Sequence, residues 1–166
     1  MTASENTLAS GKFFRFWSAA NEPRAVVLIS HGLGEHSGRY EHVAAALTAD
    51  NLHVYALDHI GHGKSPGKPA YIDRFSDLTS GVSELRDHIR RHHAGLPVIL
   101  IGHSMGGLIA IRLVLGAHAD YSGLILTGPL LGLPDTPSCL QVMLLRVLSV
   151  LAPTIKVTEI DASAVS

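Results

Sequence analysis

A serine flanked by glycines follows an apolar run of the chain. The segment VILIGHSMGG places Gly102, Ser104 and Gly106 in a G-x-S-x-G pattern. Where this pattern joins a buried strand to a helix, the serine lies on a tight turn and its hydroxyl is exposed as a nucleophile. The following helix begins with backbone amides that lack acceptors and carry positive dipole charge, which suits a developing oxyanion. A serine that only caps the helix is the structural alternative.

A glycine-rich loop, HGLGEHSGRY, begins at His31 after another apolar run. Acyl transfer needs two N–H donors, one from the residue after the nucleophile and one from the loop after an earlier strand. The sequence therefore predicts Met105 and Leu33 as backbone donors to the oxyanion. A dinucleotide-binding loop needs glycine where this loop has Ser37, and the chain has no G-x-x-x-x-G-K-[ST] phosphate loop. An ordinary strand-to-helix connection is the other interpretation.

Three charged residues lie beside these loops in the sequence. Asp58 directly follows an expected strand and precedes the GHGKS segment, so we expect it to anchor that segment. Glu35 and Arg39 are four residues apart, and we expect them to pair and to hold the oxyanion loop. These are scaffolding roles rather than steps of a reaction.

The elements that must position these residues alternate between strand and helix from residue 25 to residue 127. Short apolar runs predict buried strands, and apolar residues three and four apart predict helices. The expected strands are 11–19, 25–30, 53–57, 97–101 and 123–126, and the expected helices are 39–50, 76–93 and 105–116. This order predicts an α/β fold with a mainly parallel sheet flanked by helices. Ligands bind beyond the carboxyl ends of such strands, where Ser104 and both glycine-rich loops are expected.

The alternation stops after Thr127 and divides the chain into residues 1–127 and residues 128–166. Three prolines occur in 128–137, and residues 138–152 (SCLQVMLLRVLSVLA) are apolar around most of an expected helix. At about 21 Å, that helix is long enough to lie on a membrane but too short to span one. Peripheral membrane contact through 138–152 and packing as a core helix are equally favoured.

The composition excludes some classes of partner and indicates a cellular location. The net charge is -1, so no basic excess indicates nucleic-acid binding. Cys139 is the only cysteine, and we expect it to be a small apolar residue at a helix start rather than a reactive thiol. The polar N-terminus is unlike a secretion signal, so we expect a cytoplasmic protein that at most contacts a membrane peripherally.

Histidine is frequent, but its placement does not indicate a metal site. His88 and His92 are four residues apart on one expected helix, which is a spacing that metal ligands use. Arg90 and Arg91 beside them oppose a cation, and no third ligand follows. We therefore expect no metal and no cofactor.

Three segments together, HGLGEHSGRY, DHIGHGKSPG and GHSMGG, resemble monoacylglycerol lipases and related lysophospholipases of the α/β-hydrolase superfamily. The resemblance covers about residues 25 to 166. It implies a serine ester hydrolase that cleaves fatty acyl esters of glycerol through an acyl-enzyme on Ser104. It also implies Leu33 and Met105 as oxyanion donors, a lipid ester substrate, and a cap over the site that begins near Gly128.

The same resemblance implies two catalytic partners that we do not find. The family orders its triad serine, acid, histidine, yet the only histidine after Ser104 is His118, about 21 Å further along a helix. His31 lies near the site, but no acid is placed to orient it as a base. We therefore expect the triad acid and histidine to lie outside this chain, the fold to be truncated after the start of the cap, and the chain alone to be inactive.

Other functions stay open at this stage. A non-catalytic lipid-binding or interaction module would keep the pocket without the chemistry, and a thioesterase or peptidase would use the same scaffold. The expected strand 123–126 would form a bare sheet edge, so we also expect poor solubility or self-association.

Overall fold

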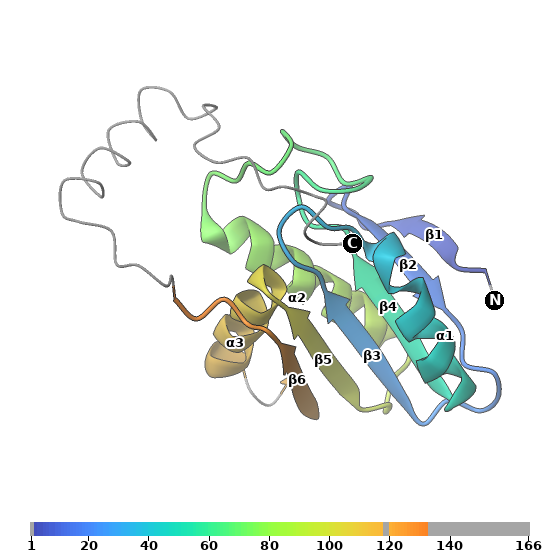
Figure 1. The fold of residues 1–166 in the computed structure, drawn as a ribbon. Coiled ribbons are helices and arrows are strands. Elements are labelled where there is room, and N and C mark those ends of the chain that lie inside the picture. Colours follow the sequence, from blue (N-terminus) through green and yellow to red (C-terminus); the bar gives the residue numbers. More distant parts are fainter. Residues whose placement is uncertain (1, 118–119, 133–166) are drawn as a thin grey trace, which may run out of the picture. The chain divides into compact units, whose positions relative to one another are not determined.

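A computed structural model describes residues 2–117 and 120–132, and these residues form a six-stranded sheet with helices on both faces (Figure 1). The strand order is β1-β2-β4-β3-β5-β6. Strands β3 to β6 are parallel, and the first two add an antiparallel extension at one side. The strands are β1 (Ser4–Thr7), β2 (Phe13–Trp17), β3 (Ala25–Ser30), β4 (Leu52–Leu57), β5 (Val98–His103) and β6 (Gly123–Thr127).

Three α-helices and one short 3₁₀-helix connect these strands. They are η1 (Ser37–Tyr40), α1 (Glu41–Ala49), α2 (Phe75–His92) and α3 (Met105–Ala117). Helix α1 covers one face of the sheet, and α2 and α3 cover the other (Figure 1). This arrangement follows from right-handed crossovers between parallel strands.

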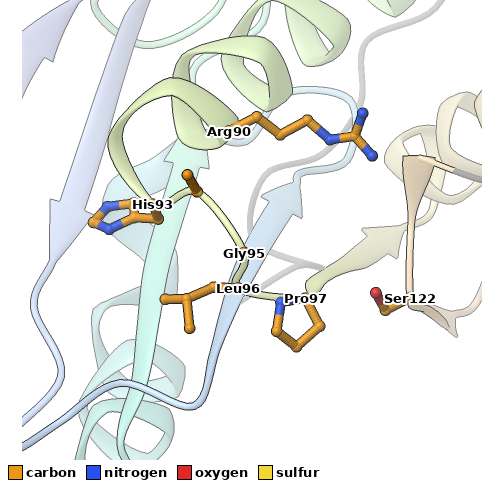
Figure 2. Close-up of a pocket in the computed structure, with 7 residues that line it drawn as sticks. Arg90, His93, Gly95, Leu96, Pro97 and Ser122 are labelled. Atoms are coloured by element: carbon orange, nitrogen blue, oxygen red, sulfur yellow. The ribbon is translucent and has the colours of Figure 1, made fainter.

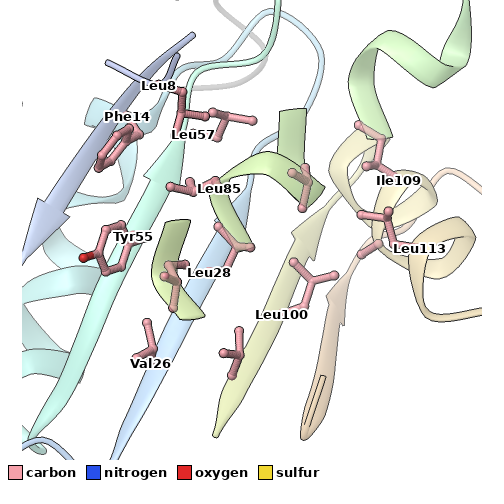
Figure 3. Packing of buried hydrophobic residues seen from close by; sticks show 14 of the residues in the cluster. Leu8, Phe14, Val26, Leu28, Tyr55, Leu57, Leu85, Leu100, Ile109 and Leu113 are labelled. Atoms are coloured by element: carbon pink, nitrogen blue, oxygen red, sulfur yellow. The ribbon is translucent and has the colours of Figure 1, made fainter. Parts of the chain in front are cut away.

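The larger part of the core lies between the sheet and helices α2 and α3 (Figure 3). Successive strand residues point to opposite faces, so Val26 and Leu28 of β3 join this cluster while Val27 and Ile29 join the smaller one near α1. From α2, the residues at 78, 82, 85 and 89 are buried in the larger cluster. Strand β3 is buried along its whole length, as its continuous apolar run predicts.

The expected strands and helices are present, with ends shifted by a few residues. The expected strand 11–19 is the shorter β2, the expected helix 39–50 starts at Glu41 after η1, and β5 extends to His103. Strand β1 is missing from the sequence-based expectation. Its residues, SENT, are all exposed and polar, so no alternation of apolar residues predicts a strand there. The segment is a strand because it pairs with β2.

The region after residue 127 is described only as far as residue 132. One compact unit comprises Met1–Leu130. Most of the proposed second part, 128–166, lies outside the described residues, together with the expected helix 138–152, Cys139 and His118. Among the described residues, no helix combines the length and the apolar character needed to cross a membrane.

Candidate active site

The register of the parallel strands brings three loops together. Ser30 of β3 lies opposite Leu57 of β4 and Gly102 of β5. The chain that leaves each strand therefore emerges at the same edge of the sheet. The oxyanion loop (His31–His36), the loop that starts at Asp58, and the turn at Ser104 all begin there, as the sequence predicts.

Ser104 stands between β5 and α3 in a conformation that serine seldom adopts. Its φ is 51°, in the left-handed region, and its side chain is half-buried rather than sealed in the core. Its amide donates to Thr127 O at 3.0 Å, and its carbonyl accepts from Gly107 and Leu130. These bonds hold the strained turn, and a strained strand-to-helix turn is what a nucleophile elbow requires.

The glycines of the motif are needed because backbone segments nearly touch there. A Cβ atom on Gly106 would lie 2.0 Å from the carbonyl oxygen of Ser30. A Cβ atom on Gly102 would lie 2.6 Å from the carbonyl oxygen of Gly106. Because backbone atoms cannot move aside as a flexible side chain can, larger residues are excluded at both positions.

The oxyanion loop packs directly against this turn at Gly32. A Cβ atom on Gly32 would lie 3.2 Å from Ser104 Cβ. The Gly32 amide donates to Glu35 Oε2 at 2.8 Å, and the Gly32 carbonyl lies 2.7 Å from His31 Nδ1. The amide and the carbonyl of Gly32 therefore both have hydrogen-bond partners within the loop.

Leu33 and Met105 are the predicted oxyanion donors, and each is adjacent in sequence to one of the two residues, Gly32 and Ser104, that pack together. Leu33 follows Gly32 and is 43% exposed. Within the described part of the chain its amide donates no hydrogen bond. Met105 is the first residue of α3, so its amide has no acceptor inside the helix. Neither amide therefore donates to a backbone carbonyl among the described residues.

Glu35 holds the oxyanion loop through backbone as well as side-chain contacts. Burial would raise the pKa of Glu35, but hydrogen bonds from the Gly32 amide and the Tyr40 hydroxyl outweigh it and lower the pKa. Arg39 lies 3.5 Å from the other carboxylate oxygen. The expected pairing of Glu35 with Arg39 is confirmed, and the contacts to Gly32 and Tyr40 are additional to it.

The nearby histidines are engaged elsewhere. His31 is buried, its Nε2 accepts from the His59 amide at 3.1 Å, and burial lowers its pKa to about 4. His103 directs Nδ1 toward Thr127, while its Cδ2 would lie 3.3 Å from a Cβ atom on Gly32. Among the described residues, no histidine or carboxylate forms a hydrogen bond to Ser104 Oγ. No described histidine or carboxylate therefore acts on Ser104 through a direct hydrogen bond.

Asp58 does more than the sequence indicated. It accepts from the Lys64 amide at 2.8 Å and so anchors GHGKS, which confirms the expectation. Its second oxygen accepts from the Ser37 amide at 2.6 Å, and that contact to η1 was not predicted. In the sequence, the one feature that indicates this contact is a carboxylate directly after a buried strand.

The histidines near the end of α2 pack against each other. His88 and His92 stack with ring centroids 4.1 Å apart, and the described residues contain no group of three metal-ligating side chains. A shallow hollow does exist between the end of α2, at Arg90 and His93, and residues Pro97 and Ser122 (Figure 2). It lies where β5 and β6 begin, at the opposite end of the sheet from Ser104.

Residues 21–166 match the family model described as serine aminopeptidase, S33. The chain belongs to this family. It is 38% identical over 155 residues to human monoglyceride lipase, covering 93% of this chain and 51% of that protein. It is 41% identical over 150 residues to monoacylglycerol lipase of Mycolicibacterium smegmatis, covering 90% and 54%.

A solved structure shares the fold. The monoacylglycerol lipase of Paleococcus ferrophilus is 31% identical, with a TM-score of 0.71 over 93% of this chain and 54% of that one. The fold is therefore that of the α/β hydrolases, of which the described residues form the N-terminal part. The chain spans about half the length of the relatives it matches.

Proposed function

We propose that Ser104 is the nucleophile of a serine ester hydrolase that cleaves fatty acyl esters of glycerol. One observation carries the proposal: Ser104 occupies a left-handed strand-to-helix turn that packs against Gly32 of the oxyanion loop. The names of the curated relatives support monoacylglycerol as the substrate class.

In the proposed reaction, Ser104 Oγ attacks the ester carbonyl and loses its proton to a base. The amides of Leu33 and Met105 stabilise the tetrahedral oxyanion, which collapses to an acyl-enzyme as the base passes that proton to the departing oxygen of glycerol. Water then attacks the acyl-enzyme, returns the serine and releases the fatty acid. Each donor in such a hole contributes about a hundredfold to a thousandfold in rate.

The base and its orienting acid come from outside the described residues. This part of the proposal rests on the two engaged ring nitrogens of His31, on the contact of His103 Nδ1 with Thr127, and on the length of the relatives. A serine without its base is a weak nucleophile. We therefore propose that the 166-residue chain by itself has little or no ester turnover.

The test measures fatty acid release from a monoacylglycerol dispersed in detergent. The longest natural polypeptide that contains these 166 residues should hydrolyse it, and Ser104→Ala should lower kcat by about 10⁴-fold or more. The 166-residue chain should show no turnover above the Ser104→Ala background. Full activity of Ser104→Ala would contradict the nucleophile, and Ser104-dependent turnover by the short chain would contradict the missing base.

The family description makes a peptidase the second candidate. Aminoacyl anilide and acyl thioester substrates assayed beside the monoacylglycerol distinguish a peptidase, a thioesterase and a lipase. A kcat/KM higher for the anilide than for the ester would replace the lipase assignment while leaving Ser104 as nucleophile.

A further inference from the structure

The two residues that follow β4 contact the oxyanion loop at both of its ends. The His59 amide donates to His31 Nε2 at 3.1 Å, at the start of the loop. Asp58 Oδ1 accepts from the Ser37 amide at 2.6 Å, just after the loop. All four residues are buried. A neighbouring strand end thus holds the loop from outside the loop itself.

The Asp58 carboxylate also binds the loop that follows it. Oδ2 accepts from the Lys64 amide at 2.8 Å, and the Asp58 carbonyl accepts from the Ser65 hydroxyl. A Cβ atom on Gly63 would lie 2.1 Å from Oδ2, and the φ of Gly63 is +52°. The chain therefore wraps closely around this one carboxylate, and a side chain at position 63 would displace it.

A carboxylate suits this position better than any other side chain of its size. Two backbone N–H groups from different loops converge on it, so both of its ends must accept. The amide of asparagine would turn one NH₂ toward an N–H donor. Asp58 is fully buried and forms no ion pair among the described residues, so these two charge-assisted bonds replace the water it has lost.

We propose that Asp58 is a positioning residue for the oxyanion hole. Ser37 lies two residues after Glu35, whose carboxylate holds the Gly32 amide. When Asp58 fixes Ser37, it fixes Glu35 and hence the direction of the peptide that presents the Leu33 amide. Its effect on catalysis rests on the function proposed above, whereas its effect on the loop does not.

The experiment is amide hydrogen exchange of the 166-residue chain, resolved by residue. Asp58→Asn should raise exchange at Gly32 and Ser37 by about tenfold or more, while amides in the middle of β3 stay protected. Gly63→Ala should do the same because it displaces the carboxylate without removing its charge. The matched control is Asp120→Asn, which alters a half-buried carboxylate contact, to Arg86 and Arg90 of α2, far from the loop.

The exchange measurement tests the positioning role of Asp58 independently of the proposed ester hydrolysis. Unchanged exchange at Gly32 and Ser37 in either folded variant, or an equal rise in Asp120→Asn, would overturn the role of Asp58. If neither variant folds, native-state exchange of the unaltered chain decides: Ser37 and Lys64 should open with one common free energy, and separate openings would overturn it.

Catalysis is measured separately in the longest natural polypeptide. There Asp58→Asn should lower kcat about tenfold to a hundredfold with little change in KM, because the lost contact acts in the transition state. A KM effect with unchanged kcat would overturn the positioning role. Absence of any Ser104-dependent turnover in the unaltered protein would instead refute the proposed function and leave the exchange result standing.

Discussion

The half-buried Ser104 has a strained backbone conformation. A non-glycine residue in the left-handed region costs about 1–3 kcal/mol, and such residues persist where surrounding contacts over-determine them. Here the contacts are the bonds of Ser104 to Thr127, Gly107 and Leu130 and the close approach of Gly106 to β3. The turn is therefore held by backbone, and its neighbours tolerate little change.

Two glycines of α3 test that view. Gly106→Ala should destabilise the protein by about 3 kcal/mol or more, because the new Cβ would overlap the Ser30 carbonyl. Gly116→Ala meets no atom within 4 Å and should be neutral or stabilise by up to about 1 kcal/mol. Denaturant unfolding measures both. Equal stabilities for the two variants would show that Gly106 is not closely packed in solution.

At this scale the sequence predicted residue types better than contacts. G-x-S-x-G placed Ser104 on its turn because the pattern is local and the steric need for glycine is local too. The Asp58 contact to Ser37 was not predictable in the same way, because it joins residues 21 apart through a sheet register. Likewise, the sequence does not show that both ring nitrogens of His31 are engaged, and it is this engagement that excludes His31 as the base.

Helix α2 ends in a cluster of histidines that packs on the sheet. The rings of His93 and His53 have centroids 4.5 Å apart, and the Tyr55 hydroxyl is 2.8 Å from His93 Nε2. The Ala19 amide lies 3.0 Å from His53 Nδ1, which accepts that bond only when unprotonated. Burial and the neighbouring His53 ring lower the pKa of His93, and burial lowers that of His53 although Glu22 opposes it.

Acid should therefore destabilise this end of α2. The unfolded chain takes up protons near pH 6.5, whereas His53 and His93 resist protonation in the folded state until lower pH. The Tm should consequently fall as pH decreases from 7.5 to 5.5. His93→Gln should reduce that fall, and His42→Gln, at an exposed position of α1, should leave it unchanged. Parallel Tm curves for His93→Gln and the parent would contradict this explanation.

Predictability also varied among elements. The buried strands β3, β4 and β5 were recognised because apolar runs leave few alternatives, and α2 because one of its faces is apolar. Strand β1 was missed because its residues are polar and its form depends on β2. The start of α1 was placed two residues early because η1 precedes it.

The sheet as a whole has two different edges. In the part of the chain that the structure describes, β6 pairs only with β5, and it exposes Leu124 and Ile125. The opposite edge, β1, is short and polar. An unpaired apolar edge promotes association between chains, whereas a polar one does so weakly.

The 166-residue chain should therefore self-associate through β6. Sedimentation velocity over a range of concentrations should show species larger than the monomer, and Ile125→Lys should reduce them because a charge on the edge opposes pairing. Asn6→Lys on β1 should not. A monomer at all concentrations, or equal effects of the two lysines, would contradict an association through β6.

Covalent labelling shows directly whether Ser104 is the nucleophile. The longest natural polypeptide that contains this chain is treated with an alkyl fluorophosphonate, which phosphonylates activated serines, and the adduct is located by peptide mass spectrometry. One adduct is expected, on Ser104, and none after Ser104→Ala. An adduct on a different serine, or none on a preparation that hydrolyses ester, would contradict Ser104 as the nucleophile.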